Sequence, residues 1–210
     1  MASVRQRQRR ALAAGGTVLG IGAVLVAAGW TDTVLGSTEF ATGSQFGIES
    51  SVDGGSMWSS HPIGAPNPLD FTTTATGMIP GSVVFAPVEL RTEPGSAAAS
   101  VTLQGATFSG SGVGSLSVAL RYRVVRESAS CDAAAFTGSP NYVVGSGGPV
   151  SLDTSAPVAF SLPAGAGPTL AGPAVPLCFE ISLPATQENW TDATLQSKSL
   201  VANWPFEGTS

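Results

Sequence analysis

The alternation of apolar and polar residues constrains the fold of this chain more than any other feature of its sequence. It recurs after residue 30 and is interrupted by glycine, proline or aspartate roughly every eight to fifteen residues, a spacing typical of short strands joined by turns. No segment in this part of the chain repeats its apolar residues with the period of a helix. The pattern therefore predicts an all-β domain.

Residues 115–125 and 175–183 alternate most regularly, and each is expected to be a strand with one face in the core and the other towards water. In the first segment the expected inner face carries Leu116, Val118, Leu120, Tyr122 and Val124, and the outer face carries Ser117, Ala119, Arg121, Arg123 and Val125. In the second the inner face carries Val175, Leu177, Phe179, Ile181 and Leu183, and the outer face carries Cys178, Glu180 and Ser182.

Further short strands complete the predicted domain, which spans residues 46–210. They are expected at residues 46–52, 69–74, 82–90, 98–108, 142–144, 157–162 and 199–206. Residues 54–68 are rich in proline and are expected to form a long surface loop. This number of strands favours an antiparallel two-sheet sandwich of the jelly-roll or immunoglobulin-like kind.

The first 28 residues have the composition of a helical, cleavable signal segment. Residues 1–10 contain four arginines and no acidic residue, and residues 11–28 form an uncharged apolar run that ends in Val-Ala-Ala. Small residues at this point suit a signal peptidase, so cleavage is expected between Ala28 and Gly29. The alternative is a membrane anchor that is retained. The pair Arg9-Arg10 leaves the twin-arginine export route as an alternative to the general one.

Export would leave a strongly acidic chain outside the cell. Without residues 1–28 the protein keeps five of its nine basic residues and all 14 acidic ones, a net charge of about −9. Such a chain repels phosphate backbones, so nucleic acid is excluded as a partner.

The only two cysteines are Cys131 and Cys178. Because an exported protein meets an oxidising environment, a disulfide between them is expected. It would attach the segment after the Arg121/Arg123 strand to the outer face of the Cys178 strand and stabilise the fold by about 3–4 kcal/mol. The alternative is a pair of reactive or metal-binding thiols, but two thiols without a spaced histidine or third cysteine cannot close a zinc site.

Residues that could support catalysis are sparse. His61 is the only histidine, and it stands in the proline-rich loop without the partners of a zinc site or a nucleophilic triad. The 14 acidic residues are scattered, with no concentrated pair for glycoside chemistry. We therefore expect no enzyme, no cofactor and no metal, with calcium at Asp53, Asp70 or Asp153 as the alternative.

Two sets of residues invite a binding role, and both have a structural explanation. Arg121, Arg123 and Arg126 are expected to pair across strands with Glu180 and other acids, although a site for anionic sugars is the alternative. Three of the four tryptophans could form a carbohydrate platform but are expected to anchor the core or its turns. They are Trp58, Trp190 and Trp204.

The junction between the signal segment and the domain resembles the start of TasA/camelysin-family proteins, which a dedicated SipW-type signal peptidase processes. The resemblance lies in Gly29-Trp30-Thr31-Asp32, then Thr38-Glu39-Phe40-Ala41-Thr42-Gly43-Ser44, then Phe46-Gly47-Ile48-Glu49. Further along, Met78-Ile79-Pro80-Gly81-Ser82-Val83-Val84-Phe85-Ala86-Pro87 and Ala202-Asn203-Trp204-Pro205-Phe206 are similar to later segments of the family.

The resemblance implies a jelly-roll protein of the cell surface or biofilm matrix. In fibre-forming members each subunit donates an N-terminal strand to the next. Residues 29–45, with Trp30, Asp32 and Phe40, would then be the donor segment, and an exposed sheet edge would be the acceptor. The cysteine pair departs from the fibre-forming members.

Two functions follow as expectations. The first is an exported structural protein that assembles with itself into fibres, with other copies or matrix components as partners and a signal peptidase acting during export. The alternative is a monomeric secreted module that binds a cell-wall polymer or a host surface through Trp58 and its loop.

Overall fold

The computed structural model describes residues 46–61, 69 and 77–210. The predicted signal segment, its cleavage point between Ala28 and Gly29, and the donor segment with Trp30, Asp32 and Phe40 lie outside the described residues. Most of the strand predicted at 69–74 lies outside them as well.

The described chain forms an antiparallel, all-β sandwich, as predicted. The larger layer, called here the large sheet, has the strand order β1-β2-β9-β5-β6, and β7 also pairs with β5. Its strands are β1 (Ile48–Ser51), β2 (Val83–Thr92), β9 (Val175–Ser182), β5 (Arg121–Arg126), β6 (Asn141–Val144) and β7 (Val150–Ser151).

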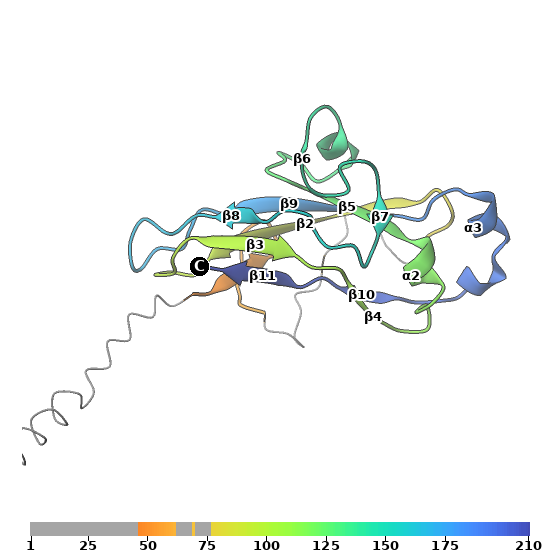
Figure 1. The fold of residues 1–210 in the computed structure, drawn as a ribbon, viewed down its shortest axis with the longest axis horizontal. Helices are drawn as coiled ribbons and strands as arrows, with labels where there is room; N and C mark the ends of the chain where they lie inside the picture. The colour runs from red at the N-terminus through yellow and green to blue at the C-terminus, as the bar shows by residue number, and fades with distance from the viewer. Residues whose placement is uncertain (1–45, 62–68, 70–76) are drawn as a thin grey trace, which may run out of the picture. The chain divides into compact units, whose positions relative to one another are not determined.

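The second layer, called here the small layer, lies against the large sheet (Figure 1). It contains the three-stranded sheet β11-β3-β8 and the pair β10-β4. Its strands are β3 (Ala99–Leu103), β4 (Thr107–Ser109), β8 (Phe160–Leu162), β10 (Val201–Asn203) and β11 (Phe206–Thr209). Within the described residues, helical structure is confined to short segments, which are α2 (Leu116–Ala119), η1 (Ala133–Phe136), α3 (Gln187–Thr191) and η2 (Ala193–Leu195).

The pairing of β3 with β11 and the pairing of β4 with β10 are two parts of one interrupted ladder. Leu103 faces Phe206 and Thr107 faces Asn203, so residues 104–106 oppose only Trp204 and Pro205 and form a bulge. Leu152, directly after β7, fills the gap in this ladder. Its carbonyl accepts bonds from Ala106 N (2.9 Å) and Trp204 Nε1 (3.1 Å). The strands predicted at 98–108 and 199–206 therefore each divide in two.

The core lies between the layers and is centred on aromatic side chains. The ring of Tyr122 lies 5.4 Å from that of Trp204 and 6.5 Å from that of Phe179. Alternate residues of the strands surround them, among them Val84, Ala86, Val88, Leu90, Val101, Leu103, Val124, Leu162, Leu177 and Ile181. The period-two pattern of the sequence thus identified the inner face of β9 correctly.

The strand predicted at residues 115–125 begins only at Arg121, and this prediction was wrong in its first half. Leu116–Ala119 is a helical turn, in which Leu116 N donates to the Gly112 carbonyl (2.8 Å) and Leu120 N to the Leu116 carbonyl (2.9 Å). The preceding glycine-rich turn closes this helix locally, so Leu116 is half-buried and Val118 is exposed despite the alternating pattern.

The buried hydroxyl of Tyr122 makes the stability of the domain sensitive to high pH. It donates to the Thr154 carbonyl, and burial raises the pKa of Tyr122 to about 12, from 10.0. The unfolded chain ionises this group first, so stability present below pH 10 is lost as pH rises towards 12. We expect a loss of about 2–3 kcal/mol over this range.

Urea unfolding at pH 9 and pH 11.5 measures that loss. Tyr122→Phe should abolish most of it, whereas Tyr142→Phe, at the other tyrosine of the chain, should retain it. Equal losses in both variants would contradict the assignment to Tyr122.

Candidate functional site

The outer face of the large sheet carries most of the residues that the sequence singles out. Three rows cross it, and the strand register defines them as Ser51–Glu89–Pro176, Pro87–Cys178–Val125 and Phe85–Glu180–Arg123. Cys178, Glu180 and Ser182 point outward as predicted, but they are buried. The same is true of Val125, because other parts of the chain cover this face.

The main cover is residues 127–140, which connect β5 to β6 and are called here the flap. Its η1 turn begins at Asp132, whose carboxylate accepts a bond from Ala134 N (2.8 Å). The flap places Phe136 against Phe85, with ring centres 5.9 Å apart, and closes a second apolar cluster over Val125 and Cys178.

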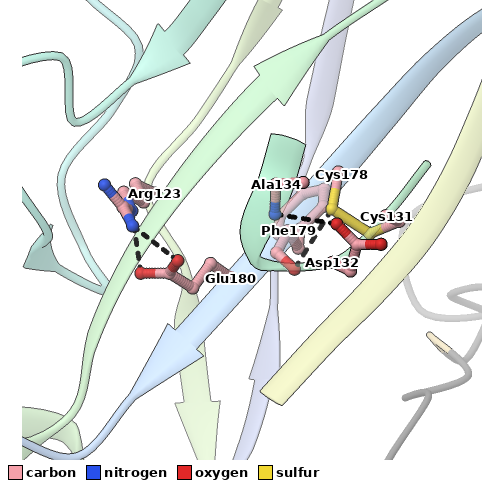
Figure 2. The surroundings of a disulfide bond; sticks show 7 residues. All are labelled: Arg123, Cys131, Asp132, Ala134, Cys178, Phe179 and Glu180. Carbon is pink, nitrogen blue, oxygen red and sulfur yellow. Dashed lines mark hydrogen bonds and ion pairs between the residues drawn. A yellow bond between two sulfur atoms is a disulfide. The ribbon is translucent and has the colours of Figure 1, made fainter. Parts of the chain in front are cut away.

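The predicted disulfide is confirmed, and it fastens the flap to the centre of the sheet. Cys131, at the start of the flap, is bonded to Cys178 on β9 (Figure 2). Both thiols are consumed in this bond, so the alternative of a reactive or metal-binding pair is excluded for the oxidised protein.

The predicted pairing of Arg123 with Glu180 is also confirmed. Arg123 Nε and Nη2 each donate to one oxygen of Glu180 over 2.7 Å, a two-point ion pair (Figure 2). The guanidinium carbon lies 4.5 Å from the centre of the Phe136 ring. The hydrogen bond to Glu180 is the main reason that the pKa of Arg123 is raised. These contacts occupy the guanidinium and argue against the alternative of an anionic-sugar site there.

The two other arginines of this row have different partners from those predicted. Arg126 pairs with its sequence neighbour Glu127 (2.8 Å) rather than across strands. Arg121 donates to backbone carbonyls, including that of Leu120 at 2.8 Å. The basic row therefore has one pairing across strands, at Arg123.

The turn after β1 is organised by Asp53. One of its carboxylate oxygens accepts bonds from Ser51 Oγ (2.7 Å) and from the backbone N of Ser56 and Met57 (3.0 Å each). These bonds lower the pKa of Asp53, and the bond from Met57 N has the largest effect. In the described residues no three His, Cys, Asp or Glu side chains cluster in a way that could hold a metal. Asp153 accepts a bond from Ser151 Oγ, and Asp70 lies outside the described residues.

The three tryptophans of interest differ in their surroundings. Trp58 anchors its turn, as predicted, because Nε1 donates to the Gly55 carbonyl (2.9 Å) and the guanidinium of Arg91 covers its ring at 4.0 Å. Trp204 belongs to the core, as predicted. Trp190, on α3, is 57% exposed, so the prediction of an anchoring role was wrong for this residue.

Two prolines explain where the strands of the large sheet separate. Glu93 N donates to the Gly47 carbonyl, so odd-numbered residues of β2 face β1, and Pro87 would face Asp53, the second residue after the end of β1. Glu127 N donates to the Pro176 carbonyl, so Pro176 faces the point where β5 ends. Because proline cannot donate a ladder bond, each neighbouring strand leaves the sheet beside it.

The separation leaves a groove between the turn after β1 and the start of the flap, called here the Glu89 groove. It has a volume of about 140 Å³. Its floor contains Pro87, Glu89 and Pro176, and its walls contain Val52, Gly54 and residues 128–131. The alternating pattern did not predict this site, although proline within an alternating segment was a usable signal of strand divergence.

The edge of the small layer formed by β10 and β11 is a second candidate site. In the described part of the chain, no strand pairs with its outer side. Trp204 and Phe206 are half-buried there and pack against the core. A Cβ added at Gly208 would lie 2.7 Å from the ring of Phe46, so residue 46 lies beside this edge.

The sequence matches no family model and no curated protein. None of the helices within the described ranges has the length and apolar character needed to cross a membrane.

Loss of the disulfide should destabilise the domain and release the flap. In Cys131→Ala/Cys178→Ala we expect the free energy of unfolding to fall by about 3–4 kcal/mol, because a long loop of the unfolded chain is no longer closed. Hydrogen exchange should accelerate at Ala135 and Thr137 of the flap more than at Val88 and Phe179. Unchanged protection of the flap would contradict its dependence on the disulfide.

Removing Arg123 should leave a buried charge without its partner. The Glu180 side chain is only 6% exposed and that of Arg123 is 23% exposed, so Arg123→Met should cost about 2–4 kcal/mol in urea unfolding. Arg123→Met/Glu180→Met should recover much of the loss, since both charges are removed. Arg126→Met, at an exposed pair, should cost less than about 1 kcal/mol. A loss at Arg123 no larger than that at Arg126 would show that burial of Glu180 is unimportant.

Proposed function

We propose that this chain is an exported structural protein of the bacterial cell surface or extracellular matrix, and that it assembles with copies of itself by strand addition. The observation that carries the proposal is the edge at β10–β11, whose outer side pairs with no strand among residues 46–61, 69 and 77–210. The disulfide is compatible with a location outside the cell. The signal-like first 28 residues and the TasA/camelysin-like junction agree with this assignment.

The backbone at the β10–β11 edge is oriented to accept another strand. Pro205 accepts a bond from Gln104 N (2.8 Å), and Ser199 is bonded to Gly112 N (2.7 Å), so odd-numbered residues face β3 and β4. The N–H groups of Ala202, Phe206 and Gly208 consequently point away from the sheet. Strand addition uses such outward groups for main-chain hydrogen bonds. Pro205 does not block this side, because its missing donor would face β3.

The side chains at this edge give an added strand an apolar surface to cover. Trp204 and Phe206 complete the core cluster around Phe179, yet both keep part of their surface accessible. Residues 29–45 join the domain at Phe46, beside β11. In the proposed assembly this segment of one copy pairs with the β10–β11 edge of the next.

Electron microscopy of the exported protein, concentrated at neutral and mildly acidic pH, tests the proposal. The wild type should form filaments. A variant lacking residues 30–45 should remain monomeric, because it has no donor segment. Ala202→Pro should also assemble poorly, since it removes an outward N–H without removing a bond to β4, whereas Ala202→Ser should assemble normally.

Two results would overturn strand addition at this edge. One is a wild type that stays monomeric at high concentration in sedimentation experiments. The other is a filament whose formation is unaffected both by Ala202→Pro and by deletion of residues 30–45.

A further inference from the structure

The Glu89 groove holds a carboxylate without a counter-charge. Glu89 is half-buried, and within residues 46–61, 69 and 77–210 its side chain makes no hydrogen bond or ion pair. Its Oε2 atom points towards Gly55, since a Cβ added there would lie 3.0 Å away. A carboxylate that is partly removed from water and left unpaired favours a cation.

The floor of the groove around Glu89 offers few hydrogen-bond donors. Pro87 and Pro176 on the floor have no N–H, and the hydroxyl of Ser51 already donates to Asp53 and accepts from Gly55 N. Ser128 and Ser130 contribute hydroxyls that can accept as well as donate. The floor is therefore apolar, with an acceptor at one side. A compact ammonium on an apolar stem, which is a lysine side chain, matches this arrangement.

The chain contains a single lysine, Lys198, and it is free to serve as that group. It stands in the exposed run 196–199, directly after Ser197, whose φ of 54° is left-handed. Within the described residues Lys198 has no hydrogen bond or ion pair. The arginines of the domain, in contrast, are all bonded to carboxylates or carbonyls. They are Arg91, Arg121, Arg123 and Arg126.

Lys198 and Glu89 of one copy lie on different layers of the sandwich. Ser199, the next residue, is bonded to the β4–α2 connection through Gly112 N (2.7 Å), in the small layer. Glu89 is on the outer face of the large sheet. Sheets in such a sandwich are separated by about 10 Å, so the two charges meet only between copies.

We infer that Lys198 of one copy inserts into the Glu89 groove of a second copy, with its methylenes over Pro87 and Pro176 and its ammonium at Glu89. This inference rests on the proposed self-assembly and adds a second contact to it. The contact joins two different surfaces, so it is head-to-tail, and repetition of it produces an open chain of subunits rather than a closed pair.

Sedimentation velocity of the exported protein over a range of concentrations and salt tests this contact. Glu89→Gln and Lys198→Gln should each weaken association by about tenfold or more, and the wild-type association should weaken with salt. Glu188→Gln, which removes another exposed carboxylate, is the matched control and should associate like the wild type. The reversed pair Glu89→Lys/Lys198→Glu should recover association.

Mixing the two single variants gives a sharper result. Lys198→Gln retains an intact groove and Glu89→Gln retains the lysine, so the mixture should form the missing contact once per pair. Recovery of hetero-pairs in the mixture supports a head-to-tail contact. A mixture that associates no better than either variant alone overturns it.

A small probe examines the groove without assembly. N-acetyl-lysine methylamide should shift the amide resonances of Ser51, Glu89 and Ser130 in the wild type but not in Glu89→Gln. N-acetyl-norleucine methylamide, which lacks the charge, should not shift them. Absence of a Glu89-dependent shift overturns the groove as an ammonium site.

The two proposals fail in different ways. If the wild type assembles and Glu89→Gln and Lys198→Gln assemble equally well, the lysine contact is wrong and strand addition stands. If the wild type remains monomeric, both self-assembly and Lys198 as the occupant are wrong. A Glu89-dependent shift with the lysine probe would then assign the groove to a lysine of another protein.

Discussion

The structure depends on the burial of β9 on both of its faces. Its inner residues, such as Phe179, pack in the core between the layers, which an amphipathic strand achieves in any sandwich. Its outer residues include Cys178, which is bonded to Cys131 of the flap, and the charged Glu180. Both are buried. Burying a carboxylate is costly unless it is paired and hydrogen-bonded, and Arg123 meets that requirement with two bonds. The flap, held by its disulfide, covers the outer face of β9.

The flap covers the large sheet only, so the large sheet and the small layer present different surfaces. On the outer face of the large sheet, the flap covers Val125 and Cys178, the ring of Trp58 lies against Arg91, and the Glu89 groove lies between the flap and the turn after β1. The small layer has fewer strands and an edge with outward backbone donors and partly accessible aromatic side chains. The edge is the proposed site for residues 29–45 of another copy, and the groove is the proposed site for Lys198 of another copy, so the two proposed contacts use separate surfaces.

Period-two alternation was sufficient to predict the fold class, the inner face of β9 and the inner positions of Tyr122 and Val124 on β5, because an amphipathic strand requires that pattern. It failed at residues 116–119, where a glycine turn determined the local hydrogen bonding, and it could not show that Val125 and Cys178 would be buried from outside. The disulfide was predictable from the number of cysteines and the expected compartment. The Arg123–Glu180 pair was predictable from their outward positions on two strands.

Other features depend on contacts that a single sequence does not reveal. The breaks in the two predicted strands at 98–108 and 199–206 come from the bulge that Leu152 fills, a partner distant in the chain. Exposure of Trp190 follows from its place on a short surface helix, which the pattern did not predict. The Glu89 groove results from the positions of Pro87 and Pro176 relative to neighbouring strands, so it becomes visible only when the strand register is known.

Hydrogen exchange, compared between the monomeric and the assembled protein, tests the central claim most directly. If copies join by adding a strand to β10–β11, the amides of Ala202, Phe206 and Gly208 should exchange much more slowly after assembly. The amides of Asn203 and Glu207, which face the sheet already, should change little. Assembly with unchanged exchange at Ala202, Phe206 and Gly208 would contradict strand addition at this edge.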